Sequence, residues 1–243
     1  ANPRSVEINK FEGFAMAGVN RVSLGVQALR PEDLRRLGRL HDVDDAVRAL
    51  EIAKSTFNRV NFDLIYGRQG QSLADWEVEL REAIDLAADH LSLYQLTIEE
   101  GTAFWDRAQA GKLRDLPSED LGADLYLASQ EICEAAGKPA YEVSNHAGPG
   151  DESRHNLVYW RGGDYVGIGP GAHGRVTLDG QRNATVARRA PGDWIKAAEA
   201  GSGDLEIERL ATQDVWAEYL MMGLRLREGL DLDRAREIDP ARA

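Results

Sequence analysis

The sequence contains a single cysteine, Cys133, in 243 residues. One cysteine excludes an intramolecular disulfide framework and a metal site built from several cysteines. Cys133 follows the apolar spacing of a predicted helix, so we expect a buried, small hydrophobic residue. The chain also lacks an apolar run of about 20 residues, the length that crosses a bilayer, and a basic-then-apolar signal at its start. We therefore expect a cytoplasmic protein without a transmembrane segment.

Basic charge is scarce, with 29 Lys and Arg against 41 Asp and Glu and a net charge of −12. Binding to nucleic acid needs clustered basic residues, so we expect no nucleic-acid partner. Residues 154–189 are a local exception, with six arginines and two acidic residues. Because guanidinium groups bind carboxylates bidentately, this region can dock a ligand with several propionates. It can equally be the solvated face of a hairpin, and the sequence leaves both interpretations open.

Strands and helices alternate along the first 150 residues. Strands are predicted at 22–27, 60–66, 91–96 and 140–143. Helices are predicted at 6–17 and 32–37, and three more follow the cap residues Asp42, Ser72 and Ser118. This alternation predicts right-handed βαβ units and a parallel sheet. The fold class is therefore α/β, with residues 1–150 forming part of an α/β barrel.

Residues 151–243 are expected to form a smaller α+β region. Asp179-Gly180 interrupts an alternating run and predicts a β-hairpin. Helices are expected at 191–200 and 213–228, and residues 230–243 resemble the start of a further helical module. These patterns place the domain boundary near residue 150.

A glycine-rich stretch lies at residues 153–175. A short strand is predicted at 165–166, followed by four closely spaced glycines at 167, 169, 171 and 174. Such glycines indicate positive φ angles or close approach of the backbone to another group. Residues 169–174 match G-x-G-x-x-G, but a dinucleotide site needs a helix directly afterwards, and a hairpin follows instead. We therefore reject a Rossmann interpretation.

Polar residues end the predicted parallel strands. Gln27 follows the first strand, Asp63 lies within the second, and Gln95 and Thr97 come at the end of the third. Ligands bind at the carboxyl ends of strands in parallel α/β sheets. We therefore expect these side chains to share one opening.

The runs H-N-x-x-Y-W at 155–160 and G-I-G-P-G-A-H-G at 167–174 carry a family resemblance. They resemble the oxygen-independent coproporphyrinogen III oxidase family of radical S-adenosylmethionine (SAM) proteins, and most of all its HemW haem-chaperone branch. The resemblance covers residues 1 to about 229. It implies a truncated, partial TIM-type (β/α) radical SAM barrel. The family's C-x-x-x-C-x-x-C loop, which holds a [4Fe–4S] cluster, is expected in a segment of the full-length parent before Ala1.

The resemblance also assigns SAM-binding residues. In the family pattern SAM is held by a Gln that ends a strand, an Arg near the following helix and an Asp in the next strand. The positions in this sequence that match or accompany this pattern are Gln27, Arg39, Asp63, Thr97 and His173. A guanidinium can pair with the methionyl carboxylate, and Asp or Gln can bond ribose hydroxyls.

Haem is the second ligand that the resemblance implies, at His155, Asn156, Tyr159 and Trp160. Imidazole can ligate haem iron axially, and aromatic rings can pack against a porphyrin. A lone histidine beside aromatics is more often part of a core. His155 is the possible iron ligand, and no catalytic residue is assigned.

Two functions compete. The first is a haem chaperone that passes haem to acceptor proteins, with SAM and a cluster in the full-length parent. The second is the radical SAM oxidase of porphyrin biosynthesis, which decarboxylates coproporphyrinogen III to protoporphyrinogen IX. The H-N-x-x-Y-W run favours the first. A degenerate barrel that binds neither ligand would be indicated if Gln27, Arg39 and Asp63 failed to converge.

Overall fold

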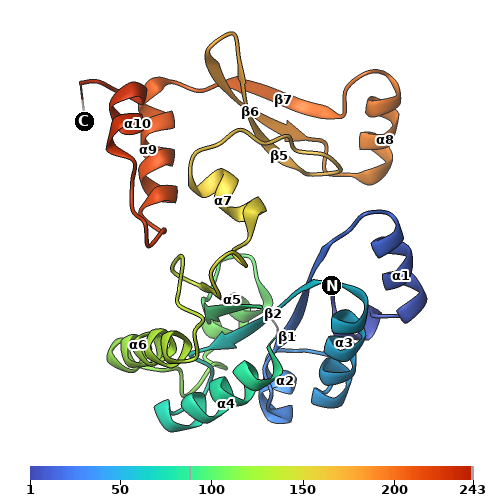
Figure 1. Cartoon of the computed structure of the whole chain (residues 1–243), viewed down its shortest axis with the longest axis vertical. Coiled ribbons are helices and arrows are strands. Elements are labelled where there is room, and N and C mark those ends of the chain that lie inside the picture. Colours follow the sequence, from blue (N-terminus) through green and yellow to red (C-terminus); the bar gives the residue numbers. More distant parts are fainter. Residues whose placement is uncertain (88, 242–243) are drawn as a thin grey trace. The chain divides into compact units, whose positions relative to one another are not determined.

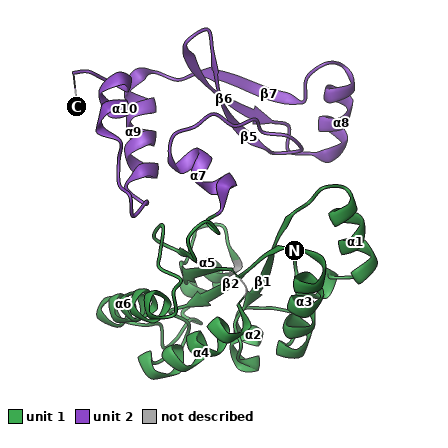
Figure 2. Cartoon of the chain, viewed as in Figure 1, with its two compact units in different colours: residues 1–152 green, residues 153–243 purple. Residues whose placement is uncertain are grey.

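The computed structural model describes residues 1–87 and 89–241 (Figure 1). The chain divides into two compact units, Ala1–Glu152 (unit 1) and Ser153–Ala243 (unit 2), which are coloured separately in Figure 2. Within the described part of the chain, no helix combines the length and the apolar character that a membrane crossing requires.

Unit 1 is built on a sheet of four strands in the order β1-β2-β3-β4. Strands β1 (Arg21–Gln27), β2 (Arg59–Tyr66) and β3 (His90–Gln95) run parallel, as the alternation of strands and helices predicts. The fourth strand, β4 (Asn145–Ala147), runs antiparallel to β3.

The prediction of a strand at 140–143 is wrong. Ala140 and Glu142 form isolated bridges there, that of Ala140 to His146, and no continuous strand. The carboxylate of Glu142 accepts hydrogen bonds from the backbone N–H of Ser144 at 2.7 Å and from the side-chain amide of Asn145 at 2.5 Å. These contacts bend the chain at 142–144, so that the following residues return alongside β3 as an antiparallel strand.

The helices of unit 1 begin largely where cap residues predict them. Asp42 and Ser72 form capping boxes, and the Ser118 hydroxyl accepts the Leu121 N–H. The sequence did not predict the short helix α5. A one-turn 3₁₀ helix (Pro3–Ser5) precedes the helices, which are α1 (Ile8–Met16), α2 (Pro31–Arg36), α3 (Val43–Thr56), α4 (Leu73–Leu86), α5 (Ala103–Gln109) and α6 (Glu119–Ala135).

The two faces of the parallel sheet differ in chemistry. One face is apolar and packs against α3, α4 and α6, where Trp76, Leu80 and Leu125 are fully buried. Its strand residues include Leu24, Val26, Phe62, Leu64, Leu91 and Leu93. The other face carries hydrogen-bonding side chains that contact one another across the strands: Ser23, Asn61, Asp63, His90 and Ser92. Side chains alternate along each strand, so a single pattern produces both faces.

Unit 2 contains an antiparallel sheet in the order β5-β6-β7. Asp179 and Gly180 join β5 to β6 with φ angles of 51° and 76°, the left-handed pair that a type I′ turn requires, so the predicted hairpin is confirmed. The predicted strand at 165–166 is reduced to a bridge between Tyr165 and Arg175. The elements of unit 2 are α7 (Arg154–Trp160), β5 (His173–Leu178), β6 (Gln181–Ala187), α8 (Pro191–Glu199), β7 (Asp204–Arg209), α9 (Thr212–Gly223) and α10 (Leu232–Ile238).

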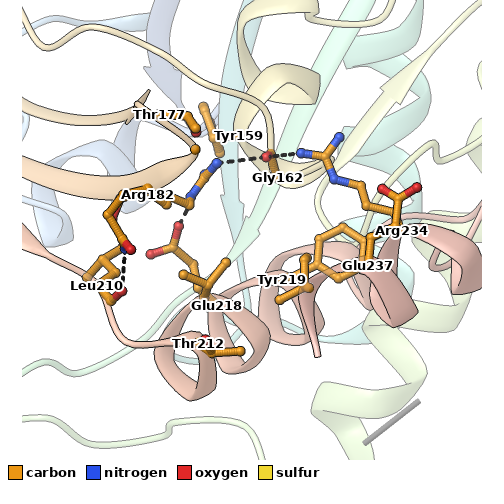
Figure 3. A pocket seen from close by; sticks show the side chains of 14 residues that line it. Tyr159, Gly162, Thr177, Arg182, Leu210, Thr212, Glu218, Tyr219, Arg234 and Glu237 are labelled. Atoms are coloured by element: carbon orange, nitrogen blue, oxygen red, sulfur yellow. Dashed lines mark hydrogen bonds and ion pairs between the residues drawn. The ribbon is translucent and has the colours of Figure 1, made fainter. Parts of the chain in front are cut away.

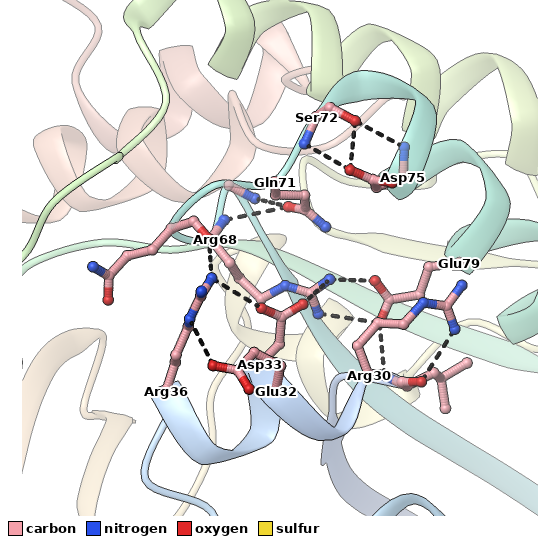
Figure 4. Close-up of polar contacts among 12 residues, drawn as sticks. Arg30, Glu32, Asp33, Arg36, Arg68, Gln71, Ser72, Asp75 and Glu79 are labelled. Atoms are coloured by element: carbon pink, nitrogen blue, oxygen red, sulfur yellow. Dashed lines mark hydrogen bonds and ion pairs between the residues drawn. The ribbon is translucent and has the colours of Figure 1, made fainter.

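A buried ion pair joins Arg68, in the loop after β2, to Glu79 of α4 (Figure 4). Arg68 is 3% exposed and Glu79 is 1% exposed, and both guanidinium NH₂ groups contact the carboxylate. Asp33 of α2 lies 3.2 Å from the same guanidinium, and Glu79 also accepts the Leu29 N–H at 2.6 Å. One carboxylate therefore holds together the loop after β1, the loop after β2 and α4.

We expect Glu79→Gln to lower the free energy of unfolding by about 3 kcal/mol or more, because removing one partner leaves the Arg68 charge buried without its main counter-ion. Glu82→Gln is the matched control. Glu82 lies on the same helix as Glu79, and its replacement breaks an exposed ion pair with Arg30, which should cost less than about 1 kcal/mol of stability. Urea unfolding of both variants measures the difference. Equal losses in the two variants would contradict the prediction.

Candidate functional site

The carboxylate of Asp63 lies at the centre of the polar face of the unit 1 sheet. Its Oδ1 accepts hydrogen bonds from the Ser23 hydroxyl at 3.1 Å and the Asn61 side-chain amide at 3.2 Å. Burial raises the pKa of Asp63, and hydrogen bonds from Ser23 and Ser92 act against that rise. The structure thus holds a carboxylate in a partly desolvated position between neighbouring strands.

Gln27 ends β1 in an unusual conformation. Its φ is 77°, in the left-handed region, and the β1–β2 pairing is irregular between Leu24 and Gln27. The Gln27 side chain turns back toward Gly25, where an added Cβ would lie 2.7 Å from the Gln27 amide nitrogen. Gly25 therefore makes room for this amide on the sheet.

Arg39 follows directly after α2. Gly38 has a φ of 70°, and the N–H groups of Gly38 and Arg39 bond to the carbonyls of Arg35 and Leu34, which is the Schellman pattern of a helix end. The Arg39 Nε is buried and has no hydrogen-bond partner within the described residues. A buried donor of this kind is costly unless a ligand supplies the acceptor.

Gln27, Arg39 and Asp63 all belong to the β1–β2 side of unit 1. Gln27 is aligned with Leu64, the residue after Asp63, on the neighbouring strand. The loop that carries Arg39 is tied to β1 by a 2.9 Å contact between His41 Nε2 and the Val26 carbonyl. These three predicted residues thus lie on adjoining segments.

The other two predicted SAM residues are placed differently. Thr97 is exposed in the loop after β3, with its hydroxyl 3.5 Å from a carboxylate oxygen of Glu99. His173 is exposed at the start of β5 and belongs to unit 2. Their part in binding SAM stays a prediction.

The glycine turn of unit 2 is explained by its own backbone packing. A Cβ at Gly167 would lie 2.6 Å from the His173 carbonyl, and one at Gly174 would lie 2.6 Å from the Thr185 hydroxyl. Gly169 and Gly171 have φ angles of 109° and 70°. Gly167 and Gly174 are thus required for close approach of neighbouring segments, and Gly169 and Gly171 for their positive φ angles, whether or not a ligand also binds there.

The predicted haem residues lie on α7 in unit 2. His155 is exposed, and its ring packs edge-on against Tyr159 with centroids 5.6 Å apart. Its Nδ1 lies 3.3 Å from the Asn156 side-chain oxygen. Trp160 is only 6% exposed and lies beneath the Arg225 guanidinium at 5.7 Å, so its indole belongs to the interior of unit 2. Of this group His155 is exposed, Asn156 and Tyr159 are half-buried, and Trp160 is buried.

Unit 2 also has a cavity of about 280 Å³ that the sequence did not predict (Figure 3). Arg182 and Arg234 on its wall both donate to the Gly162 carbonyl, at 3.0 and 2.6 Å. Arg182 also pairs with Asp164 at 3.0 Å and lies 3.6 Å from Glu218. At least this member of the arginine-rich region is therefore engaged in holding unit 2 together.

Sequence reasoning missed the neighbours of Asp63. Ser23, Asn61 and His90 donate or accept hydrogen bonds around it, and His90 also contacts the Tyr141 hydroxyl at 2.8 Å. The available signal was the alternation of polar and apolar residues in N-F-D-L and H-L-S-L, together with Ser23 and Gln27 on alternate positions of V-S-L-G-V-Q. This alternation indicates that one face of a parallel sheet is lined with hydrogen-bonding groups.

Within residues 1–87 and 89–241, no group of three or more His, Cys, Asp or Glu side chains is arranged to hold a metal ion. Cys133 is buried, and burial raises the pKa of its thiol to about 12. The described residues therefore do not fit the ligand set of an iron–sulfur cluster.

We expect the stability of the chain to fall as the pH is lowered from about 6.5 to about 5. Burial lowers the pKa of His90 to about 3 and that of His146 to about 4, so below pH 6.5 the unfolded chain takes up protons that the folded chain does not. The effect approaches about 1.4 kcal/mol per pH unit for each histidine.

Urea unfolding at several pH values measures this slope. His146→Gln should reduce it, and His155→Ala, at an exposed histidine, should leave it unchanged. A slope that His146→Gln does not alter would contradict this account of His146.

Comparison with known proteins agrees with this architecture. Residues 1–83 match the model of the radical SAM superfamily. The chain is 42% identical to the heme chaperone HemW of Escherichia coli over 231 residues, which cover 94% of this chain and 58% of that protein. It is 39% identical over 235 residues to the radical S-adenosyl methionine domain-containing protein 1, mitochondrial, of Danio rerio, covering 94% of this chain and 53% of that protein.

Among solved structures, coproporphyrinogen III oxidase (HemN) from Escherichia coli, a radical SAM enzyme, matches with a TM-score of 0.75 at 23% identity. The match covers 98% of this chain and 56% of that protein, and at this identity it establishes the fold. The chain thus spans little more than half the length of these proteins. On the sequence relationships and the shared fold together, the chain belongs to the HemW/HemN-like group of the radical SAM superfamily.

Proposed function

We propose that this chain is part of a HemW-like haem chaperone that binds SAM and haem and delivers haem to acceptor proteins. The observation that carries the SAM part of the proposal is the Arg39 guanidinium, whose buried Nε has no partner within the described residues. The identity of about 40% to HemW of Escherichia coli, spread over nearly the whole chain, supports the haem part.

The described residues fit one end of a SAM molecule and its ribose. Arg39 would pair with the methionyl carboxylate, which supplies the acceptor that its Nε lacks. Asp63 and Gln27, on adjoining strands, would accept and donate hydrogen bonds at the ribose hydroxyls. When bound, SAM would supply the adenosyl group for radical chemistry. This chain's part is to orient SAM and shield it from water.

The cluster is a different case. An iron–sulfur cluster would need several cysteine thiolates, and this chain has Cys133 alone, buried and with a raised thiol pKa. The residues present do not hold the cluster, so we assign it to no residue of this chain.

Haem binding is proposed at the exposed end of α7. His155 would offer an imidazole nitrogen to the haem iron. The Asn156 side-chain oxygen contacts the Nδ1 atom of His155, and the Tyr159 ring packs edge-on against the imidazole. Trp160 would act from the interior, by fixing the position of Tyr159 at a centroid distance of 5.4 Å.

The second candidate is oxidation of coproporphyrinogen III. The fold shared with HemN favours it, at 23% identity. We prefer the chaperone because HemW sequences are closer, at 42% and 38% identity for the Escherichia coli and Mycobacterium tuberculosis proteins. Anaerobic incubation of the reconstituted full-length protein with coproporphyrinogen III decides between them, and formation of protoporphyrinogen IX would favour the oxidase.

Arg39→Gln should weaken binding of S-adenosylhomocysteine to the full-length protein by roughly 10-fold to 100-fold, because a hydrogen bond to a charged group is lost. Arg48→Gln, at an exposed arginine of α3, is the matched control and should leave affinity unchanged. Isothermal titration calorimetry measures both. An affinity that Arg39→Gln does not reduce would remove Arg39 from the site.

Haem titration of the full-length protein tests the second ligand. We expect a shift of the Soret band in the wild-type protein and its loss in His155→Ala, because the axial nitrogen is removed. His173→Ala, at another exposed histidine of unit 2, should retain the shift. Retention of the shift in His155→Ala would exclude this residue as the iron ligand.

A further inference from the structure

Asn61 occupies the centre of a continuous chain of hydrogen bonds that ends on Asp63. Its side-chain nitrogen lies 3.2 Å from Asp63 Oδ1 and 2.6 Å from the Ser23 hydroxyl, and its oxygen lies 2.8 Å from His90 Nδ1. Asn61 is 5% exposed and His90 is 2% exposed. The chain continues to the Tyr141 hydroxyl, 2.8 Å from His90 Nε2.

The donor and acceptor groups allow only one direction of donation along this series of hydrogen bonds, from Tyr141 to Asp63. An ionised carboxylate only accepts, so the Asn61 nitrogen must face Asp63 and its oxygen must face His90. His90 therefore carries its proton on Nδ1 and donates it to Asn61. Because burial lowers the pKa of His90 to about 3, the ring is neutral and its Nε2 accepts from the Tyr141 hydroxyl.

The same geometry distinguishes the two oxygens of Asp63. The Ser23 hydroxyl and the Asn61 amide both donate to Oδ1. Neither of these hydrogen bonds uses Oδ2, and the Ser92 hydroxyl, which also influences the pKa of Asp63, lies 3.2 and 2.8 Å from the side-chain oxygens of Asn61 and Asn145. With Oδ1 fixed at two points, the plane of the carboxylate is fixed as well, and Oδ2 has a defined direction.

We propose that Asn61, itself oriented by His90 and Tyr141, is a positioning residue that fixes Asp63 through Oδ1 so that Oδ2 is presented to the hydroxyl groups of a bound nucleoside. The inference rests on the proposed SAM site, and it adds residues that the family resemblance does not assign. Tyr141, His90 and Asn61 do not touch the ligand in this account. They determine which way the carboxylate that touches it is turned.

Asn61→Asp tests the proposal because it replaces the donor facing Asp63 with an acceptor. The substitution changes the side-chain volume very little. The measurement is the affinity of the full-length protein for S-adenosylhomocysteine and for its 2′-deoxy analogue. The wild-type protein should prefer the hydroxylated ligand by about tenfold or more, since a site built around a hydroxyl discriminates against its absence. In Asn61→Asp this preference should fall to about twofold or less.

A general loss of folding would weaken the binding of both ligands equally and leave the ratio of the two affinities unchanged. The ratio therefore separates a positioning role from an effect on stability. Asn183→Asp, the same change in the β6 strand of unit 2, is the matched control and should keep the wild-type ratio. Tyr141→Phe removes one hydroxyl at the far end of the chain and should lower the preference by about twofold to threefold.

The outcomes are distinguishable. If the wild-type protein binds neither ligand, the proposed SAM site fails. If it prefers the hydroxylated ligand and the folded Asn61→Asp variant keeps that preference, the positioning role is overturned while the SAM site stands. Should Asn61→Asp fail to fold, an unaltered preference in Tyr141→Phe overturns the proposal.

Discussion

The pairing of Arg68 with Glu79 is the constraint on which the geometry of unit 1 depends. Moving either charge out of water costs several kcal/mol, and only close, bidentate contact offsets that loss. Glu79 also holds the Leu29 amide of the β1 loop, and Arg68 belongs to the β2 loop. Neither loop can move without separating the pair. Gln27 ends β1 and Asp63 lies within β2, so the pair holds the loops that follow the two strands of the candidate site without belonging to the site.

The two faces of the parallel sheet have different roles. The face that packs on the helices contains Phe62 and Leu64 among fully buried aliphatic and aromatic side chains, and burial of this surface drives folding. The opposite face carries Asn61 and His90, which are buried, and Asp63, which is half-buried, and these side chains are linked by hydrogen bonds. Such a network is stable only when its members are paired, which is why it also determines orientation.

Much of the fold could be predicted from local signals, because these depend on a few adjacent residues. The caps at Asp42 and Ser72 and the turn at Asp179-Gly180 are of this kind. The strand expected at 140–143 was wrong, because the path there is set by the contacts of the Glu142 carboxylate with its neighbours. Strand β7 was missed, since its apolar residues remain largely exposed and alternate with acidic ones.

The site shows the same division. Asp63 and Gln27 could be chosen from the sequence because strand ends are readable, whereas the roles of Asn61 and His90 depend on register between strands, which one sequence does not reveal. Arg39 was identified through family resemblance alone, and its buried Nε has a thermodynamic consequence. Folding leaves this donor without an acceptor, so any molecule that supplies one stabilises the native state over the unfolded state. The melting temperature of the protein should therefore rise with the concentration of such a molecule.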